Sequence, residues 1–284
     1  MRKIHILPNL LTLANAFCGL LAICKGIDAL AYAGPDPLRF YQNLSTAAAL
    51  IYVGMVFDAF DGKVARMVGG GSAFGAQLDS FSDMLTFGVA PAILTKILIE
   101  HEAPAWDVAV NPRLTFAAAA VFAVMAILRL ARFNLENDPD PEAHKSFRGL
   151  PSPAAAGTIA SGLLLYLALR KPQLEHSDGI RTPLGLVLDR LPPDLHLGWT
   201  LYALWALLVI LGLLMVSRVR YVHMFSALTG RGQFLTLVWV VVAAVLLIAM
   251  PALSLFVVFH LYVLVGLCAW AVRRGARRTA EAAP

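Results

Sequence analysis

The chain has 284 residues, of which 59% are hydrophobic and only 14% are charged, and its formal net charge is +5. Soluble domains carry about 25% charged residues, so this composition excludes an ordinary soluble protein and indicates an integral membrane protein. The basic balance does not require a nucleic-acid partner, because lysine and arginine gather in the cytoplasmic loops of membrane proteins.

Eight segments are long and apolar enough to cross a bilayer, which takes about 20 residues of helix. In chain order, we expect helices at residues 8–30, 44–68, 73–99, 113–135, 152–170, 199–217, 233–249 and 252–272. Pro251 divides the last apolar run, and we expect it to end one helix and start the next; a single kinked helix is the alternative. The predicted fold class is all-α, a polytopic protein with about eight transmembrane helices in a single membrane domain spanning residues 1–284.

The distribution of basic residues predicts the orientation of these helices. Eight spans put both termini on one side of the membrane, and if that side is the cytoplasm, the inside segments hold fifteen of the 23 lysine and arginine residues. We therefore expect an integral protein of a prokaryotic cell or inner membrane, with both termini and the turn at 69–72 in the cytoplasm. The segment 171–198 is rich in proline and charge, and we expect a surface loop there with room for a short helix.

Four aspartates lie at the end of the second predicted helix and in the third, although charges inside a membrane are costly and usually functional. Within each helix they stand three or four residues apart and therefore share one face. A glycine turn makes the two helices antiparallel neighbours, so the four carboxylates can converge at similar depths. These residues are Asp58, Asp61, Asp79 and Asp83.

Carboxylates in a low-dielectric site repel one another unless a cation is present. Oxygen ligands without nearby histidine or cysteine indicate Mg²⁺, Mn²⁺ or Ca²⁺. Four carboxylates suffice for two ions that share a ligand, and such a pair suits displacement at phosphorus. Two other interpretations of the acids are a polar network that locks two helices together and a divalent-cation channel or transporter.

The pattern Asp58-x2-Asp61-Gly62-x2-Ala65-Arg66-x8-Gly75-x3-Asp79-x3-Asp83 resembles the signature of the CDP-alcohol phosphatidyltransferase family at every defined position. This family transfers a substituted phosphate from a CDP-linked lipid or alcohol to a hydroxyl group and releases CMP. The resemblance implies the family's fold, a homodimer and two bound ions, Mg²⁺ or Mn²⁺. It implies metal ligation by all four aspartates, with Asp83 also acting as the general base. The residues implied to contact the CDP group are Gly62, Ala65, Arg66 and Gly75.

Three further segments resemble the phosphatidylserine synthase branch of that family, so that the resemblance covers roughly residues 5–160. They are LPNLLTLANAFCGL in the first helix, LRLARFN at 128–134 and FRGLPSPAAAG at 147–157. This branch implies CDP-diacylglycerol and L-serine as substrates, with membrane lipid as a further partner of the protein. Catalysis would belong to residues 1–160, whereas residues 161–284 would serve packing and dimerisation.

The same segments contain the candidates for substrate contact. Arg132 and Arg148 can pair with the carboxylate of serine, Asn134 can orient the acceptor, and the resemblance favours Asn9 as a contact of the CDP group. The alternatives are that the arginines anchor the chain to lipid headgroups, and that Asn9 caps its helix or joins helices by hydrogen bonds. The signature itself leaves glycerol 3-phosphate or inositol phosphate open as acceptor.

Overall fold

The computed structural model describes residues 6–67, 72–136, 147–170, 197–221 and 233–281. These residues form helices joined by short connections and one short ribbon, in which the strands β1 (Phe147–Arg148) and β2 (Arg220–Tyr221) pair antiparallel. The helices are α1 (Ile6–Tyr32), α2 (Pro37–Met67), α3 (Ala73–Asp83), η1 (Met84–Val89), α4 (Ala90–Glu102), η2 (Pro104–Trp106), α5 (Pro112–Glu136), α6 (Ser152–Arg170), α8 (Gly198–Val216), α9 (Gln233–Ala249) and α10 (Pro251–Glu281).

The eight predicted helices are all present, with α3, η1 and α4 together forming the third. Seven of the described helical segments are long and apolar enough to cross a membrane, which supports an integral membrane protein. In α9 the apolar stretch Val240–Ala249 is shorter than a span. Pro251 begins α10 directly after α9 ends, so the prediction of two separate helices is confirmed. Most of the predicted turn at 69–72 and of the loop at 171–198 lies outside the described residues.

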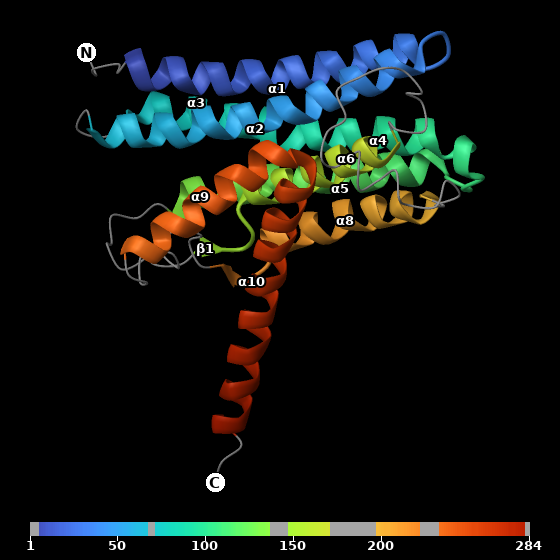
Figure 1. Cartoon of the computed structure of the whole chain (residues 1–284). Coiled ribbons are helices and arrows are strands. Elements are labelled where there is room, and N and C mark those ends of the chain that lie inside the picture. The colour runs from blue at the N-terminus through green and yellow to red at the C-terminus, as the bar shows by residue number, and fades with distance from the viewer. Residues whose placement is uncertain (1–5, 68–71, 137–146, 171–196, 222–232, 282–284) are drawn as a thin grey trace.

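The helices from α1 to α8 run side by side as a bundle, with α1 along one edge and α8 along the opposite edge (Figure 1). The N-terminal end of α1 lies at the same end of this bundle as the last residues of α2 and the first residues of α3. By contrast, α10 runs steeply across the bundle, and its second half projects away from it. Eight spans packed side by side would place the end of α10 at the same end of the bundle as the start of α1. The structure instead places the end of α10 away from the bundle.

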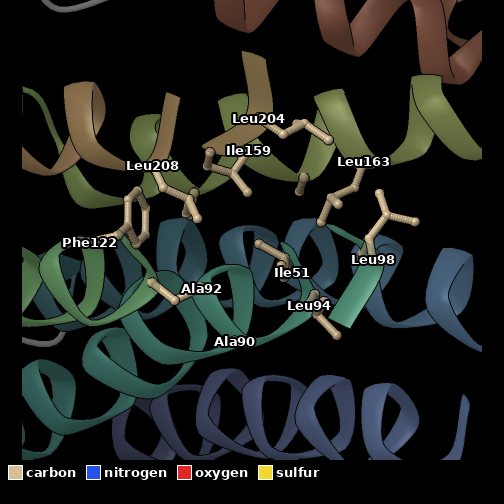
Figure 2. Packing of buried hydrophobic residues seen from close by; sticks show 14 of the residues in the cluster. Ile51, Ala90, Ala92, Leu94, Leu98, Phe122, Ile159, Leu163, Leu204 and Leu208 are labelled. Atoms are coloured by element: carbon tan, nitrogen blue, oxygen red, sulfur yellow. The ribbon is translucent and has the colours of Figure 1, made fainter. Parts of the chain in front are cut away.

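The centre of the bundle is α4. It lies in the segment Ala73–Glu102, and 72% of the residues in an apolar 18-residue stretch of this segment are buried. The corresponding shares are 28% for α2 and 33% for α8. Leu94 and Leu98 of α4 belong to the same buried cluster as Ile51 of α2 and Leu163 of α6 (Figure 2). This buried helix continues directly from the acidic segment and holds it against the rest of the bundle.

A buried polar cluster closes the end of α4 that is remote from the aspartates. Glu102 is only 1% exposed, and it accepts hydrogen bonds from the Tyr41 hydroxyl, from the Tyr166 hydroxyl at 2.6 Å and from Arg170 Nε at 3.0 Å. Trp106 Nε1 donates to the Tyr166 oxygen at 2.7 Å. One carboxylate thus ties α2, α4 and α6 together at this end of the bundle.

The close approach of α1, α2 and η1 depends on Gly54. A Cβ atom at this position would lie 2.6 Å from Thr86 Cγ2 and 2.9 Å from Asn15 Oδ1. We expect Gly54→Ala to destabilise the protein by about 1–3 kcal/mol, the usual effect of overpacking, measured as a lower thermal unfolding temperature in detergent. Gly34→Ala is the control, because no atom lies within 4 Å of the added Cβ. Equal unfolding temperatures for the two variants would contradict the close packing.

Candidate active site

The predicted acidic site lies where α2 and α3 pack against α1. Asp58 and Asp61 of α2 and Asp79 of α3 each place one carboxylate oxygen within 4.8 Å of the others. Asp83, one turn further along, lies beside Asp58 and accepts a hydrogen bond from Asn15 Nδ2 at 3.2 Å. The structure therefore gathers three of the four aspartates into one tight group and places the fourth next to it.

A buried polar stripe on α1 holds these acids. Thr12 Oγ1 donates to Asp61 Oδ2 at 2.8 Å, and Asn15 holds Asp83. In return, the Ser82 hydroxyl donates to the Thr12 carbonyl at 2.9 Å. Hydrogen bonds thus join α1 to α2 and to α3, and two of them end on the acids. The three-residue spacing of Thr12 and Asn15 was the signal, since it puts both on one face of α1.

Asn9 and Gly75 lie together at the edge of the acidic group. A Cβ atom on Gly75 would come within 3.0 Å of Asn9 Oδ1, while Asn9 Nδ2 is buried without a hydrogen-bond partner. Gly62 has open space around it, and the nearest atom to a Cβ added there would be Nη1 of the exposed Arg66, at 3.9 Å. Ala65 is half-buried on the same helix. Small residues, one amide nitrogen without a hydrogen-bond partner and one exposed guanidinium thus lie near the acids, and the surroundings of Gly62 are open.

The donor set of the acidic group fits a divalent metal ion. Three carboxylate oxygens from different side chains face one another at short range, and Asp79 Oδ1 is buried without a hydrogen-bond partner. A buried carboxylate oxygen is rarely left without a proton donor or a cation. Oxygen-only coordination of this kind suits Mg²⁺, Mn²⁺ or Ca²⁺, so Asp58, Asp61 and Asp79 can hold a metal ion.

A π-helical segment, η1, follows Asp83 directly. Such segments occur mostly as short insertions in α-helices and often at functional sites. Here the wider turn places Thr86 against α1, where its hydroxyl donates to the Asn15 carbonyl at 2.9 Å. The sequence predicted an unbroken helix over 73–99, and nothing in its hydropathy marks this change of winding.

Arg129 of α5 is the site residue that the sequence interpretation missed. Its Nη1 donates to Ser152 Oγ at 2.7 Å, and its Nε is buried without a partner. The guanidinium lies close enough to Asp58 and Asp83 to interact with both electrostatically. The sequence counted Arg129 as one of several basic residues at the cytoplasmic end, because a helix pattern does not show which of two neighbouring arginines turns inward.

The other candidates for acceptor contact lie nearer the surface. Arg132 is half-buried, and Asn134 is exposed and donates from Nδ2 to Ser80 Oγ at 2.9 Å. This bond joins the end of α5 to α3 next to Asp79. Arg148 lies on β1, paired with Arg220, and its side chain is outside the described part of the structure. Acceptor contact by these residues stays a prediction.

Comparison with known proteins adds a family and named relatives. The sequence profile of the family described as CDP-alcohol phosphatidyltransferase matches residues 5–188. A CDP-diacylglycerol–serine O-phosphatidyltransferase of Helicobacter pylori (strain J99) is 30% identical over 271 residues, which is 95% of this chain and 93% of the relative. An enzyme of the same name from Bacillus subtilis is 34% identical over 53% of this chain and 71% of its own length. An archaetidylserine synthase of Methanothermobacter thermautotrophicus is 36% identical over 55% of this chain and 56% of its own length.

Proposed function

Because this chain belongs to the CDP-alcohol phosphatidyltransferase family, we propose that it transfers the phosphatidyl group of CDP-diacylglycerol to the hydroxyl of L-serine. The products are phosphatidylserine and CMP. The observation that carries this proposal is the alignment, over 95% of the chain, with a relative named for this reaction. The grouping of Asp58, Asp61 and Asp79 beside Asp83 supplies the chemistry that the reaction needs.

Two Mg²⁺ or Mn²⁺ ions held by the four aspartates would neutralise the diphosphate and the charge that develops as CMP leaves. The ligands are kept in place by α1, since Thr12 fixes Asp61 and Asn15 fixes Asp83. On the other side of the acids, Arg129 adds a positive charge close to Asp58 and Asp83.

Asp83 is the proposed general base. Its carboxylate is oriented by Asn15 and lies at the inner end of the acidic group. It would take the proton of the serine hydroxyl while the oxygen of that hydroxyl forms its bond to phosphorus. The bond between this phosphorus and the bridging oxygen breaks, and that oxygen leaves with CMP.

The space beside Gly62 and Gly75 is the proposed position of the CDP group. The open surroundings of Gly62 let a bulky nucleotide approach α2, Gly75 lets Asn9 come close to α3, and Ala65 adds little volume. Arg66 can pair with a phosphate, and the buried amide of Asn9 offers an N–H group that has no partner in the protein.

The proposed setting is the cytoplasmic side of the membrane, with the acids facing the aqueous phase from which serine arrives. We also propose a homodimer, in which residues 161–284 contribute packing. In the apolar 18-residue stretch of α10, only 6% of the residues are buried within one chain. Most of this helix is therefore available for contact with lipid or with a second copy of the chain.

The acceptor is tested by CMP release from CDP-diacylglycerol, measured with purified protein and Mg²⁺ or Mn²⁺. Serine, glycerol 3-phosphate and inositol phosphate are supplied in separate reactions. We expect release that depends on serine and on the metal, with little above background for the two phosphorylated acceptors. Release with glycerol 3-phosphate or inositol phosphate but not with serine would keep the reaction type and overturn the acceptor.

A further inference from the structure

The inner face of α10 is seated on the bundle by close ring packing. Phe259 lies against Gly157 of α6 so tightly that a Cβ on this glycine would collide with its ring. The same ring lies 5.6 Å from Tyr52, whose hydroxyl donates to the Gly157 carbonyl at 2.7 Å. This contact fixes the rotation of α10 and therefore determines which of its side chains face the acidic site.

One turn further along, two tyrosines meet. Tyr221 of β2 is 1% exposed, and its ring lies over Gly266, where there is no room for a Cβ atom. The Tyr221 ring is 5.7 Å from the ring of Tyr262 on α10. Tyr262 of α10 thus packs against Tyr221 of β2.

Tyr262 lies near Arg129, since the two side chains are close enough to interact electrostatically. Arg129 keeps a buried Nε–H without a partner in the protein, and buried donors are usually completed by ordered water or a bound ligand. Ser152, fully buried, accepts a hydrogen bond from Arg129 and so retains its own hydroxyl hydrogen for donation. This corner therefore offers hydrogen-bond donors and a positive charge, which together suit an anion.

The group formed by Arg129, Ser152 and Tyr262 lies apart from the proposed position of the CDP group beside Gly62 and Gly75. Asp61 faces α1 through Thr12, next to the glycines and Asn9, whereas Asp58 and Asp83 are the acids near Arg129. Asp83 is also the proposed base, so the hydroxyl of the acceptor belongs beside it. A small amino acid with its hydroxyl at Asp83 would direct its carboxylate toward Arg129.

We propose that α10 completes the acceptor subsite: Arg129, Ser152 and Tyr262 receive the carboxylate of the amino-acid acceptor, and Tyr221 is a positioning residue that holds Tyr262. This inference rests on the proposed transfer to serine. It gives the last helices a part in acceptor recognition beyond packing and dimerisation. Both tyrosines lie after residue 188, where the match to the family profile ends.

The test compares Michaelis constants for the two substrates in the purified full-length protein. For Tyr262→Phe, which keeps the ring and removes the hydroxyl, we expect a rise of about tenfold in KM for serine, the effect of losing one hydrogen bond to a charged group. KM for CDP-diacylglycerol should stay unchanged. Tyr221→Leu should also raise KM for serine, because its ring packing is lost, whereas Tyr221→Phe should behave as wild type.

The control is Tyr202→Phe, the same change at an exposed tyrosine of α8, which should alter neither constant. An unchanged KM for serine in Tyr262→Phe would overturn the subsite while leaving the proposed function intact. An equal rise in both Michaelis constants would also overturn it, since that indicates general damage. Wild-type protein that releases no CMP with serine would overturn the proposed function and this inference together.

Discussion

Asp61→Ala is expected to lower CMP release by about three orders of magnitude or more, as loss of a group that stabilises transition-state charge commonly does. Asp61 is 5% exposed, shares the oxygen group with Asp58 and Asp79, and is held by Thr12 at 2.8 Å. In the proposed two-ion site, Asp61 would be the carboxylate that both ions share. Under the proposed function, its removal would weaken metal binding and leave the diphosphate charge without compensation.

The matched control is Lys63→Ala, a change two residues along the same helix. Lys63 is exposed and lies off the acidic face, so its removal should change turnover less than about twofold to threefold, the range of ordinary surface effects. Both variants should elute as wild type in detergent, which separates lost chemistry from lost fold. Wild-type turnover of Asp61→Ala in saturating Mg²⁺ or Mn²⁺ would show that the two-ion assignment is wrong.

Glu102→Ala is expected to cause the largest loss of stability, about 3–5 kcal/mol, because it removes one partner of a buried ion pair and leaves the other uncompensated. Arg170 has only 18% of its side chain exposed and would keep its charge without the carboxylate. The hydroxyl groups of Tyr41 and Tyr166 would lose their common acceptor. Thermal unfolding in detergent should fall by roughly 10 °C.

Glu100→Ala provides the comparison for this variant, two residues earlier on the same helix. Glu100 pairs with Lys96 at 2.6 Å, and both side chains are about one-third exposed (28% and 32%). Partly exposed pairs of this kind contribute about 0–1 kcal/mol, so the unfolding temperature should change little. If the two glutamate variants unfold at the same temperature, Glu102 does not hold the three helices together.

The spacing of the aspartates predicted much of the site, because residues three and four apart share a helix face regardless of the surroundings. That rule placed Asp58 with Asp61 and Asp79 with Asp83, and the glycine-rich segment between them indicated antiparallel helices. It did not separate the tight group of three from Asp83. This difference depends on side-chain contacts with α1, where Asn15 donates a hydrogen bond to Asp83.

Other features depend on packing between distant segments and left no local signal. Hydropathy predicts α10 as one more span, but it shows neither the steep course of this helix nor the packing of Phe259 on Gly157. Arg129 and Arg132 both lie on α5, and the sequence does not show that Arg129 is the one near Asp58 and Asp83. Glu102 looks in the sequence like a charge near the end of a helix, because its partners come from two other helices.

The most direct test of the proposed reaction is the identity of the lipid product. Purified protein is incubated with CDP-diacylglycerol, Mg²⁺ or Mn²⁺ and isotopically labelled L-serine, and the extracted lipids are analysed by mass spectrometry. We predict labelled phosphatidylserine formed in equal amount to CMP, and none from Asp61→Ala or after removal of the metal by a chelator. CMP release without labelled phosphatidylserine, or labelled product that persists in the Asp61 variant, would contradict the proposed function of the acidic site.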